Sequence, residues 1–160
     1  MSMIGNYLMV DGETIQGIIS GEIDMFEFLY NTEHSDDDYL DIDKAWHAIH
    51  YILCGHPWEG EPPYFNVVLG GTEINDEDVG YGPARYLVPA EVKEVYEAIK
   101  DIKEEEFKSK FDCDEFARND IYPEYSSNDE FDYVWGYFTK VRDMFEKASL
   151  TGKYMLLYLN

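Results

Sequence analysis

The sequence predicts an α+β fold, a single compact domain in which a small mixed or antiparallel sheet packs with several helices. Three observations lead to this prediction. The chain has 160 residues, which is the length of one domain, so we expect one domain over residues 1–160. Stretches rich in strand formers stand near both ends, with mostly helical periodicity between them. The strict strand–helix alternation of a doubly wound parallel sheet is missing.

The first forty residues predict one strand, two short helices and an acidic loop. Ile4–Val10 is rich in strand formers and ends at the turn pair Asp11–Gly12. The helical spacing of Ile15, Ile18 and Ile19 predicts one helix that begins near Asp11 or Gly12, and apolar residues predict a second short helix after Gly21. Residues 34–43, "HSDDDYLDID", lack the alternating ligands and central glycine of a calcium-binding loop, so we expect a solvated charged loop.

A third helix is predicted over residues 42–54. Asp41 is a suitable N-cap, Gly55 suits the position after the last turn, and Pro57 prevents continuation. After a proline-rich connection, residues 65–71, "FNVVLGG", read as a short buried strand and residues 72–85 as an acidic loop. Residues 85–88 are a further candidate strand.

The second half of the chain is predicted to be mostly helical. Pro89 stands at the first position of a helix, and residues 103–120 break into shorter helical pieces. Ser127–Glu130 is a capping box that begins a long amphipathic helix, which Gly152 ends. Residues 153–159, "KYMLLYL", read as a terminal strand.

The predicted third helix carries the first set of candidate site residues. At about 100° per residue, its core face includes Ile42, Trp46 and Ile49. A polar stripe runs beside that face and consists of Asp43, His47, His50 and Cys54. Such side chains can bind zinc, but Asp43 and Cys54 lie roughly 16 Å apart along a helix axis, too far for one ion. Histidines that complete the packing explain the stripe equally, so we predict no metal and no cofactor.

A ligand-binding or catalytic site remains open on the same helix. A histidine oriented by a carboxylate can act as a general base, and Asp43 and His50 stand two turns apart. No nucleophile elbow, metalloprotease motif or phosphate-binding loop accompanies them. Arg85, after the glycine-bearing "GYGPAR" segment, is either held by a carboxylate or free to bind an anionic ligand. Asp43, Trp46, His50 and Arg85 are therefore the ligand-binding candidates.

Charge narrows the classes of partner. The formal net charge is −22, from 34 acidic and 12 basic residues, and no Lys or Arg precedes Lys44. Such a charge disfavours binding to nucleic acid and to anionic lipid, and it attracts a basic protein partner. The alternative is that the acidity serves only to keep the protein soluble. No apolar run is long enough to span a membrane, and two widely spaced cysteines suit free thiols in the cytoplasm.

Several segments together resemble the YfbM-like family of uncharacterised bacterial proteins. They are "MIG" (Met3–Gly5), "LDIDKAWHAIHYILCG" (Leu40–Gly55), "LGG" (Leu69–Gly71), "GYGPAR" (Gly80–Arg85) and "IYP" (Ile121–Pro123). The resemblance implies an α+β domain without an established activity. It carries over Asp43, Trp46 and His50 as a candidate shared site, whereas His47 and Cys54 lie outside the family pattern.

Two functions from different classes are compatible with these observations. The first is an acidic interaction protein of the immunity or inhibitor type, since acidic rims speed association with basic partners and the 14 tyrosines can anchor an interface. It predicts one contiguous acidic face with exposed aromatic residues. The alternative is a small-molecule-binding or hydrolytic domain, which predicts that Asp43, Trp46 and His50 converge on a pocket. The oligomeric state is left open.

Overall fold

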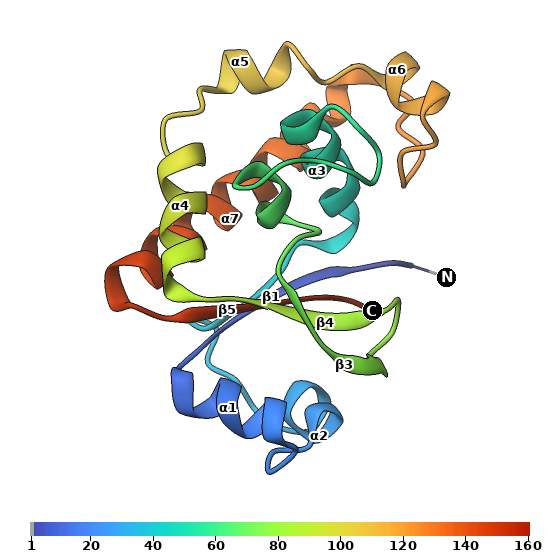
Figure 1. Cartoon of the computed structure of the whole chain (residues 1–160). Helices are drawn as coiled ribbons and strands as arrows, with labels where there is room; N and C mark the ends of the chain where they lie inside the picture. The colour runs from blue at the N-terminus through green and yellow to red at the C-terminus, as the bar shows by residue number, and fades with distance from the viewer. Residues whose placement is uncertain (1) are drawn as a thin grey trace.

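The structure is a computed structural model that describes residues 2–160. In this part of the chain, five strands form one sheet in the order β2-β1-β5-β4-β3, and every neighbouring pair is antiparallel (Figure 1). The strands are β1 (Gly5–Val10), β2 (Tyr39–Asp41), β3 (Thr72–Asp78), β4 (Pro83–Leu87) and β5 (Tyr154–Leu159). The predicted α+β class with a small antiparallel sheet is confirmed.

The helices lie on the two faces of this sheet in unequal numbers. They are α1 (Gly12–Ser20), α2 (Met25–Tyr30), α3 (Trp46–Cys54), α4 (Pro89–Ile99), α5 (Glu104–Lys108), α6 (Cys113–Arg118) and α7 (Phe131–Thr151). Short 3₁₀ turns, η1 (Asp43–Ala45), η2 (Tyr64–Val67) and η3 (Asn128–Glu130), complete the secondary structure. Figure 1 shows α1 and α2 on one face and the remaining helices on the other. No helix among residues 2–160 combines the length and apolar character that crossing a membrane requires.

The central strands β1 and β5 contribute side chains to the cores on both faces of the sheet, because successive side chains of a strand point to opposite sides. Tyr7 and Met9 of β1 face the side of α3–α7, whereas Leu8 and Val10 face α1 and α2. All six residues of β1 are buried, which explains why their apolar pattern is continuous rather than alternating. The two ends of the sequence meet here, since Ile4 and Asn160 exchange backbone hydrogen bonds of 2.8 and 3.1 Å.

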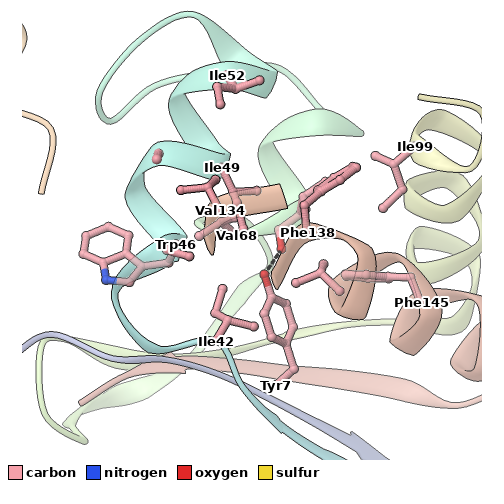
Figure 2. Packing of buried hydrophobic residues seen from close by; sticks show 14 of the residues in the cluster. Tyr7, Ile42, Trp46, Ile49, Ile52, Val68, Ile99, Val134, Phe138 and Phe145 are labelled. Atoms are coloured by element: carbon pink, nitrogen blue, oxygen red, sulfur yellow. Dashed lines mark hydrogen bonds between the residues drawn. The ribbon is translucent and has the colours of Figure 1, made fainter. Parts of the chain in front are cut away.

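The larger core lies between the sheet and α3, α4 and α7. Figure 2 shows Tyr7 rising from the sheet into this core beside Ile42, with its hydroxyl directed toward Val68 and Phe138. Phe138 and Phe145 of α7 are completely buried, and Phe107 of α5 stacks on Phe138 with ring centroids 4.6 Å apart. Helix α3, which carries the predicted site, contributes Trp46, Ile49 and Ile52 to the same core.

The smaller core lies on the opposite face, under α1 and α2. Ile15 and Ile18 of α1 and Met25 and Leu29 of α2 pack against the sheet. Asp11 and Asp24 cap these two helices by accepting backbone hydrogen bonds at their first turns. Strand β3 contributes Ile74 to the same core, so this strand belongs with the α1–α2 face.

Two predictions between residues 65 and 85 are wrong. The predicted strand at 65–71 contains the 3₁₀ turn η2, and the predicted loop at 72–85 contains β3 and part of β4. The backbone of residues 67–70 is bound by two side chains instead of a neighbouring strand. Tyr7 donates to the carbonyl of Val67 at 2.5 Å, and Arg85 donates to the carbonyls of Val68 and Gly70 at 2.9 and 2.7 Å.

The third helix also begins later than predicted. Asp41 belongs to β2, and its Oδ1 accepts from the backbone N–H of Asp43 at 2.7 Å, which supports the turn η1 rather than capping an α-helix. The α-helix itself begins at Trp46. Its end is as predicted, because Gly55 has φ +72° and donates its N–H to the carbonyl of Tyr51. The capping box at Ser127 and Glu130 and the long helix behind it are likewise confirmed.

Candidate functional site

Asp43 lies in the turn η1, where it joins the beginning of α3 to α7. Its φ of +52° is unusual for a residue with a side chain. Tyr133 of α7 donates its hydroxyl to Asp43 Oδ2 at 2.9 Å and accepts from the backbone N–H of Lys44 at 3.1 Å. Burial, reinforced by the hydrogen bond to this carboxylate, raises the pKa of Tyr133. Asp43 therefore has a structural partner that accounts for its position.

Trp46 lies inside the larger core, as the helical pattern predicts. Its side chain is completely buried, and its indole Nε1 donates to the carbonyl of Met3 at 2.9 Å. The ring stacks on His47 with centroids 4.8 Å apart and planes 15° apart. Trp46 thus connects α3 to the segment that precedes β1.

His47 is buried with both ring nitrogens engaged. Nδ1 accepts from the backbone N–H of Tyr122 at 2.9 Å, and Nε2 lies 2.9 Å from the carbonyl of Pro57, to which it must donate. This pair of partners requires the neutral ring with its proton on Nε2. Burial lowers the pKa of His47, which favours the same neutral form. His47 therefore connects three segments of the chain: α3, the 56–60 loop and the 121–126 segment.

His50 is equally buried but has no hydrogen-bond partner on either ring nitrogen. The ring meets Phe65 edge-on with centroids 5.9 Å apart. Burial lowers the pKa of His50 to about 4, although the backbone groups of His56 and Glu59 in the covering loop weakly favour the protonated ring. His50 is consequently neutral at pH 7, and neither of its ring nitrogens has a partner in hydrogen-bond geometry.

Cys54 ends the stripe in a half-buried position under the same loop. A Cβ atom placed on Gly60 would lie 2.6 Å from its sulfur, so the loop backbone runs directly against the thiol. Burial raises the pKa of Cys54 to about 11. Both cysteines are free, and Cys54 stays a thiol rather than a thiolate at neutral pH.

Arg85 lies away from α3 and contacts backbone carbonyls rather than a carboxylate. Its Nη1 makes the two hydrogen bonds to residues 68 and 70 described above. Burial lowers the pKa of Arg85 to about 10, so the side chain remains charged at neutral pH. The guanidinium holds the 67–70 segment against β4.

The four candidates do not converge on one cavity. Trp46 and His50 are one helical turn apart on α3, Asp43 contacts α7, and Arg85 contacts the 67–70 segment. None of five cavities described for residues 2–160 is lined by any of the four. Within the same residues no group of three His, Cys, Asp or Glu side chains has the arrangement of a metal site. A ligand-binding role for Asp43, Trp46, His50 and Arg85 stays a prediction.

A different feature of the molecule is the uneven distribution of charge. The first 84 residues hold half of the 34 acidic side chains but one basic side chain, Lys44. Helices α1 and α2 and the β3–β4 hairpin contain no Lys or Arg through residue 82, and we call these three elements the acidic layer. Its exposed carboxylates are Glu13, Glu22, Asp24, Glu27, Glu73, Asp76, Glu77 and Asp78.

Exposed apolar and aromatic side chains lie among these carboxylates. Ile19, Phe26, Tyr30 and Tyr81 are each between 37% and 44% exposed. Tyr30 packs on Phe26 with ring centroids 5.7 Å apart and donates its hydroxyl to the carbonyl of Val79. This hydrogen bond joins α2 to the turn between β3 and β4, so these two parts of the acidic layer are neighbours.

The acidic layer is also hollowed along α1. An open depression of about 1030 Å³ runs beside this helix and is lined by Asp11, Glu13, Glu22 and Tyr154, among others. Lys153 is the cation whose charge reaches Asp11. The sequence indicates part of this surface through the absence of Lys and Arg before Lys44. That residues 72–82 add their carboxylates to the same side of the sheet is visible only in the structure.

Comparisons with known proteins agree with this architecture. The family model "Domain of unknown function (DUF1877)" matches residues 1–158. A crystal structure of YfbM, a protein of unknown function from Escherichia coli, matches with a TM-score of 0.77 and 20% sequence identity over 98% of this chain and 99% of that chain. No curated protein matches the sequence. The chain therefore belongs to the YfbM-like DUF1877 family.

Proposed function

We propose that the chain is a protein-interaction module of the immunity or inhibitor type, whose acidic layer binds a basic protein. The observation that carries the proposal is that the neighbouring elements α1, α2 and the β3–β4 hairpin carry exposed carboxylates together with exposed aromatic rings. Their one basic residue, Arg85, donates to the backbone carbonyls of residues 68 and 70. Surfaces of one charge sign accelerate association with the opposite sign, and aromatic side chains supply buried contact area.

Helices α4 and α5, on the opposite side of the sheet, differ from the acidic layer. Helices α4 and α5 carry acidic residues too, but Lys93, Lys100 and Lys108 stand among them. Lys100 pairs with Glu97 at 2.7 Å, and Lys108 lies over the ring of Phe131. We therefore expect a basic partner to be attracted more strongly to the acidic layer than to α4 and α5.

The test distinguishes binding that depends on the carboxylates of the acidic layer from binding that depends only on the net charge of the protein. One variant combines Glu13→Gln, Glu22→Gln and Glu27→Gln in the acidic layer, and a control combines Glu94→Gln, Glu104→Gln and Glu105→Gln on α4 and α5, with the same net charge. All six carboxylates are exposed, so both proteins should fold. Each is immobilised and incubated with lysate of the source cells at low and moderate salt, and the captured proteins are quantified.

We expect one or more basic proteins to be captured by the wild type and the control but not by the layer variant. Phe26→Ala should reduce the same capture without a change of charge, because it removes an aromatic anchor. Capture of no basic protein at either salt concentration, or equal loss in both charge variants, contradicts the proposal. Cytoplasmic location belongs to the proposal as well and is supported by the two free cysteines.

A ligand-binding or hydrolytic domain built on Asp43, Trp46 and His50 is the second candidate. The unpartnered nitrogens of His50 favour it, because a buried polar group without a hydrogen bond costs free energy that a ligand could recover. A ligand would have to displace the 56–60 loop to reach this ring. A metabolite screen by thermal shift tests the idea, and it is abandoned if His50→Ala leaves every ligand-induced shift unchanged.

A further inference from the structure

A second concave surface lies far from the acidic layer, beside α6. It is a hollow of about 210 Å³ between this helix and residues 120–126. The floor consists of Phe116, Ile121 and Tyr125, all buried, and the rim carries the exposed carboxylates of Asp120 and Glu124. In Figure 1, α6 lies on the side of the sheet opposite α1 and α2.

The floor of this hollow is rigid. The rings of Phe116 and Tyr125 are 5.8 Å apart, and Phe111 packs edge-on against both at 5.1 and 5.6 Å. The backbone N–H of Ile121 donates to the carbonyl of Phe116 at 3.0 Å, which fixes the turn after α6. A rigid aromatic floor means that a ligand would lose little free energy in ordering the site.

The rim has negative charge that no neighbouring side chain neutralises. No Lys or Arg lines the hollow, and in the described part of the chain neither Asp120 nor Glu124 takes part in a salt bridge. The hydroxyl of Tyr125, in the floor, is buried and has no hydrogen-bond partner in the described part of the chain, so it can accept a hydrogen bond from a cationic group. An anionic or purely apolar ligand would leave these carboxylates without a partner or repel them.

We propose that this hollow binds an ammonium or guanidinium group on a short alkyl stem, such as a Lys or Arg side chain of a partner or a free alkylamine. The stem packs against Ile121 and Ala117, and the cationic head donates to the Tyr125 hydroxyl and to the carboxylates of Asp120 and Glu124. The site is separate from the acidic layer, so it does not depend on the function proposed above.

The test uses the full chain and n-butylammonium chloride, with n-butanol as the neutral control and sodium chloride as the ionic control. Amide chemical shifts are monitored by NMR during each titration. We expect saturable shifts confined to residues 116–126 for n-butylammonium, and weaker, non-saturating shifts for n-butanol. Shifts that spread over the acidic layer, or that equal those of n-butanol, overturn the proposal.

Charge-removing variants identify the carboxylates responsible. Asp120→Asn with Glu124→Gln should weaken n-butylammonium binding roughly fivefold or more, because two exposed charge-assisted contacts are lost. Asn is chosen since Asp120 has φ +55°, a conformation that Asn also tolerates. Glu104→Gln with Glu105→Gln has the same charge change and should leave the affinity unaltered. Equal weakening in the two double variants overturns the proposal.

The cation can belong to a side chain of a protein partner or to a free alkylamine, and the two differ in whether the alkyl stem is attached to a polypeptide backbone. The blocked tripeptide acetyl-Gly-Lys-Gly-amide presents the same ammonium group on a polypeptide. If it binds at residues 116–126 as tightly as n-butylammonium, the hollow accepts side chains of a protein partner. If n-butylammonium binds there and the tripeptide does not, the ligand is a free alkylamine.

Discussion

The two faces of the sheet differ in how they use polar residues. On the side of α3–α7, polar groups such as the rings of His47 and Trp46 lie inside the core and join distant segments by hydrogen bonds. On the side of α1 and α2, polar residues are mostly carboxylates that face solvent over a small aliphatic core. The first face holds the fold together, whereas the second exposes charge without neutralising partners. The difference indicates that buried polar hydrogen bonds contribute to stability mainly on the α3–α7 side of the sheet.

Replacement of one core residue on each face by alanine should have the largest effect on the free energy of unfolding. Trp46→Ala should lower the free energy of unfolding by about 4 kcal/mol, and Ile18→Ala in the smaller core by about 3 kcal/mol. Trp46 costs more because its hydrogen bond to Met3 is lost together with the packing. Urea denaturation monitored by circular dichroism measures both. Ile18→Ala costing more than Trp46→Ala would contradict the contribution of buried polar hydrogen bonds on the α3–α7 side.

Lowering the pH should decrease the free energy of unfolding, because His50 is buried in its neutral form on the α3–α7 side. In the unfolded chain His50 binds a proton below its ordinary pKa of about 6.5, whereas in the folded protein it does so near pH 4. The unfolded state therefore binds more protons between these values, and stability falls as the pH falls. The loss from His50 is about 3 kcal/mol by pH 4.

Urea denaturation at several pH values between 7 and 4 measures this loss. Neutralisation of surface carboxylates relieves repulsion below pH 5 and acts in the opposite direction, so the variant His50→Leu serves as the reference. The wild type should lose more stability on acidification than this variant. Identical pH profiles would show that His50 does not titrate as its buried position requires.

The two histidines should respond oppositely to replacement by leucine at pH 7. His47→Leu leaves the N–H of Tyr122 and the carbonyl of Pro57 without partners and should cost about 2 kcal/mol. His50→Leu breaks no hydrogen bond and should be neutral or up to about 1 kcal/mol more stable. Thermal denaturation compares them. A loss of stability in His50→Leu equal to that in His47→Leu would indicate that the ring of His50 has a polar partner.

Removal of charge from the acidic layer should have the smallest effect, and it should be stabilising. The triple variant Glu13→Gln, Glu22→Gln and Glu27→Gln should gain about 0.5 kcal/mol at low salt, because like charges without cations repel one another. The matched triple on α4 and α5 should gain less, since lysines stand among its carboxylates. Thermal denaturation at low salt and at high concentrations of sodium chloride tests this, and equal gains would mean that the two surfaces do not differ electrostatically.

Local signals in the sequence predicted the elements whose ends are set by their own residues. The capping box at Ser127 and Glu130 and the terminating Gly55 and Gly152 act within one turn of the chain, so they are readable without the fold. Residues 65–71 were misassigned because Tyr7 and Arg85, distant in sequence, bind their backbone. The acidic strand β3 was missed because it lies at the edge of the sheet and places one side chain, Ile74, in the core.

The candidate site was predicted less well than the fold. Helical periodicity placed Trp46 inside the core, and this was confirmed. The same periodicity put His47 and His50 on a margin, but both are completely buried because the 56–60 loop and Phe65 cover that side of α3. Coverage by a loop that folds back over the helix leaves no periodic trace in the helix itself, so the periodicity could not show it.

The pairing of β1 with β5 has a consequence for synthesis of the protein. Strand β5 is central in the sheet, between β1 and β4, yet its residues are translated after all the other strands. During synthesis on the ribosome, the edges of β1 and β4 that pair with β5 therefore have no partner strand until residues 154–159 emerge. A nascent chain of this kind needs protection from aggregation until its last strand closes the sheet.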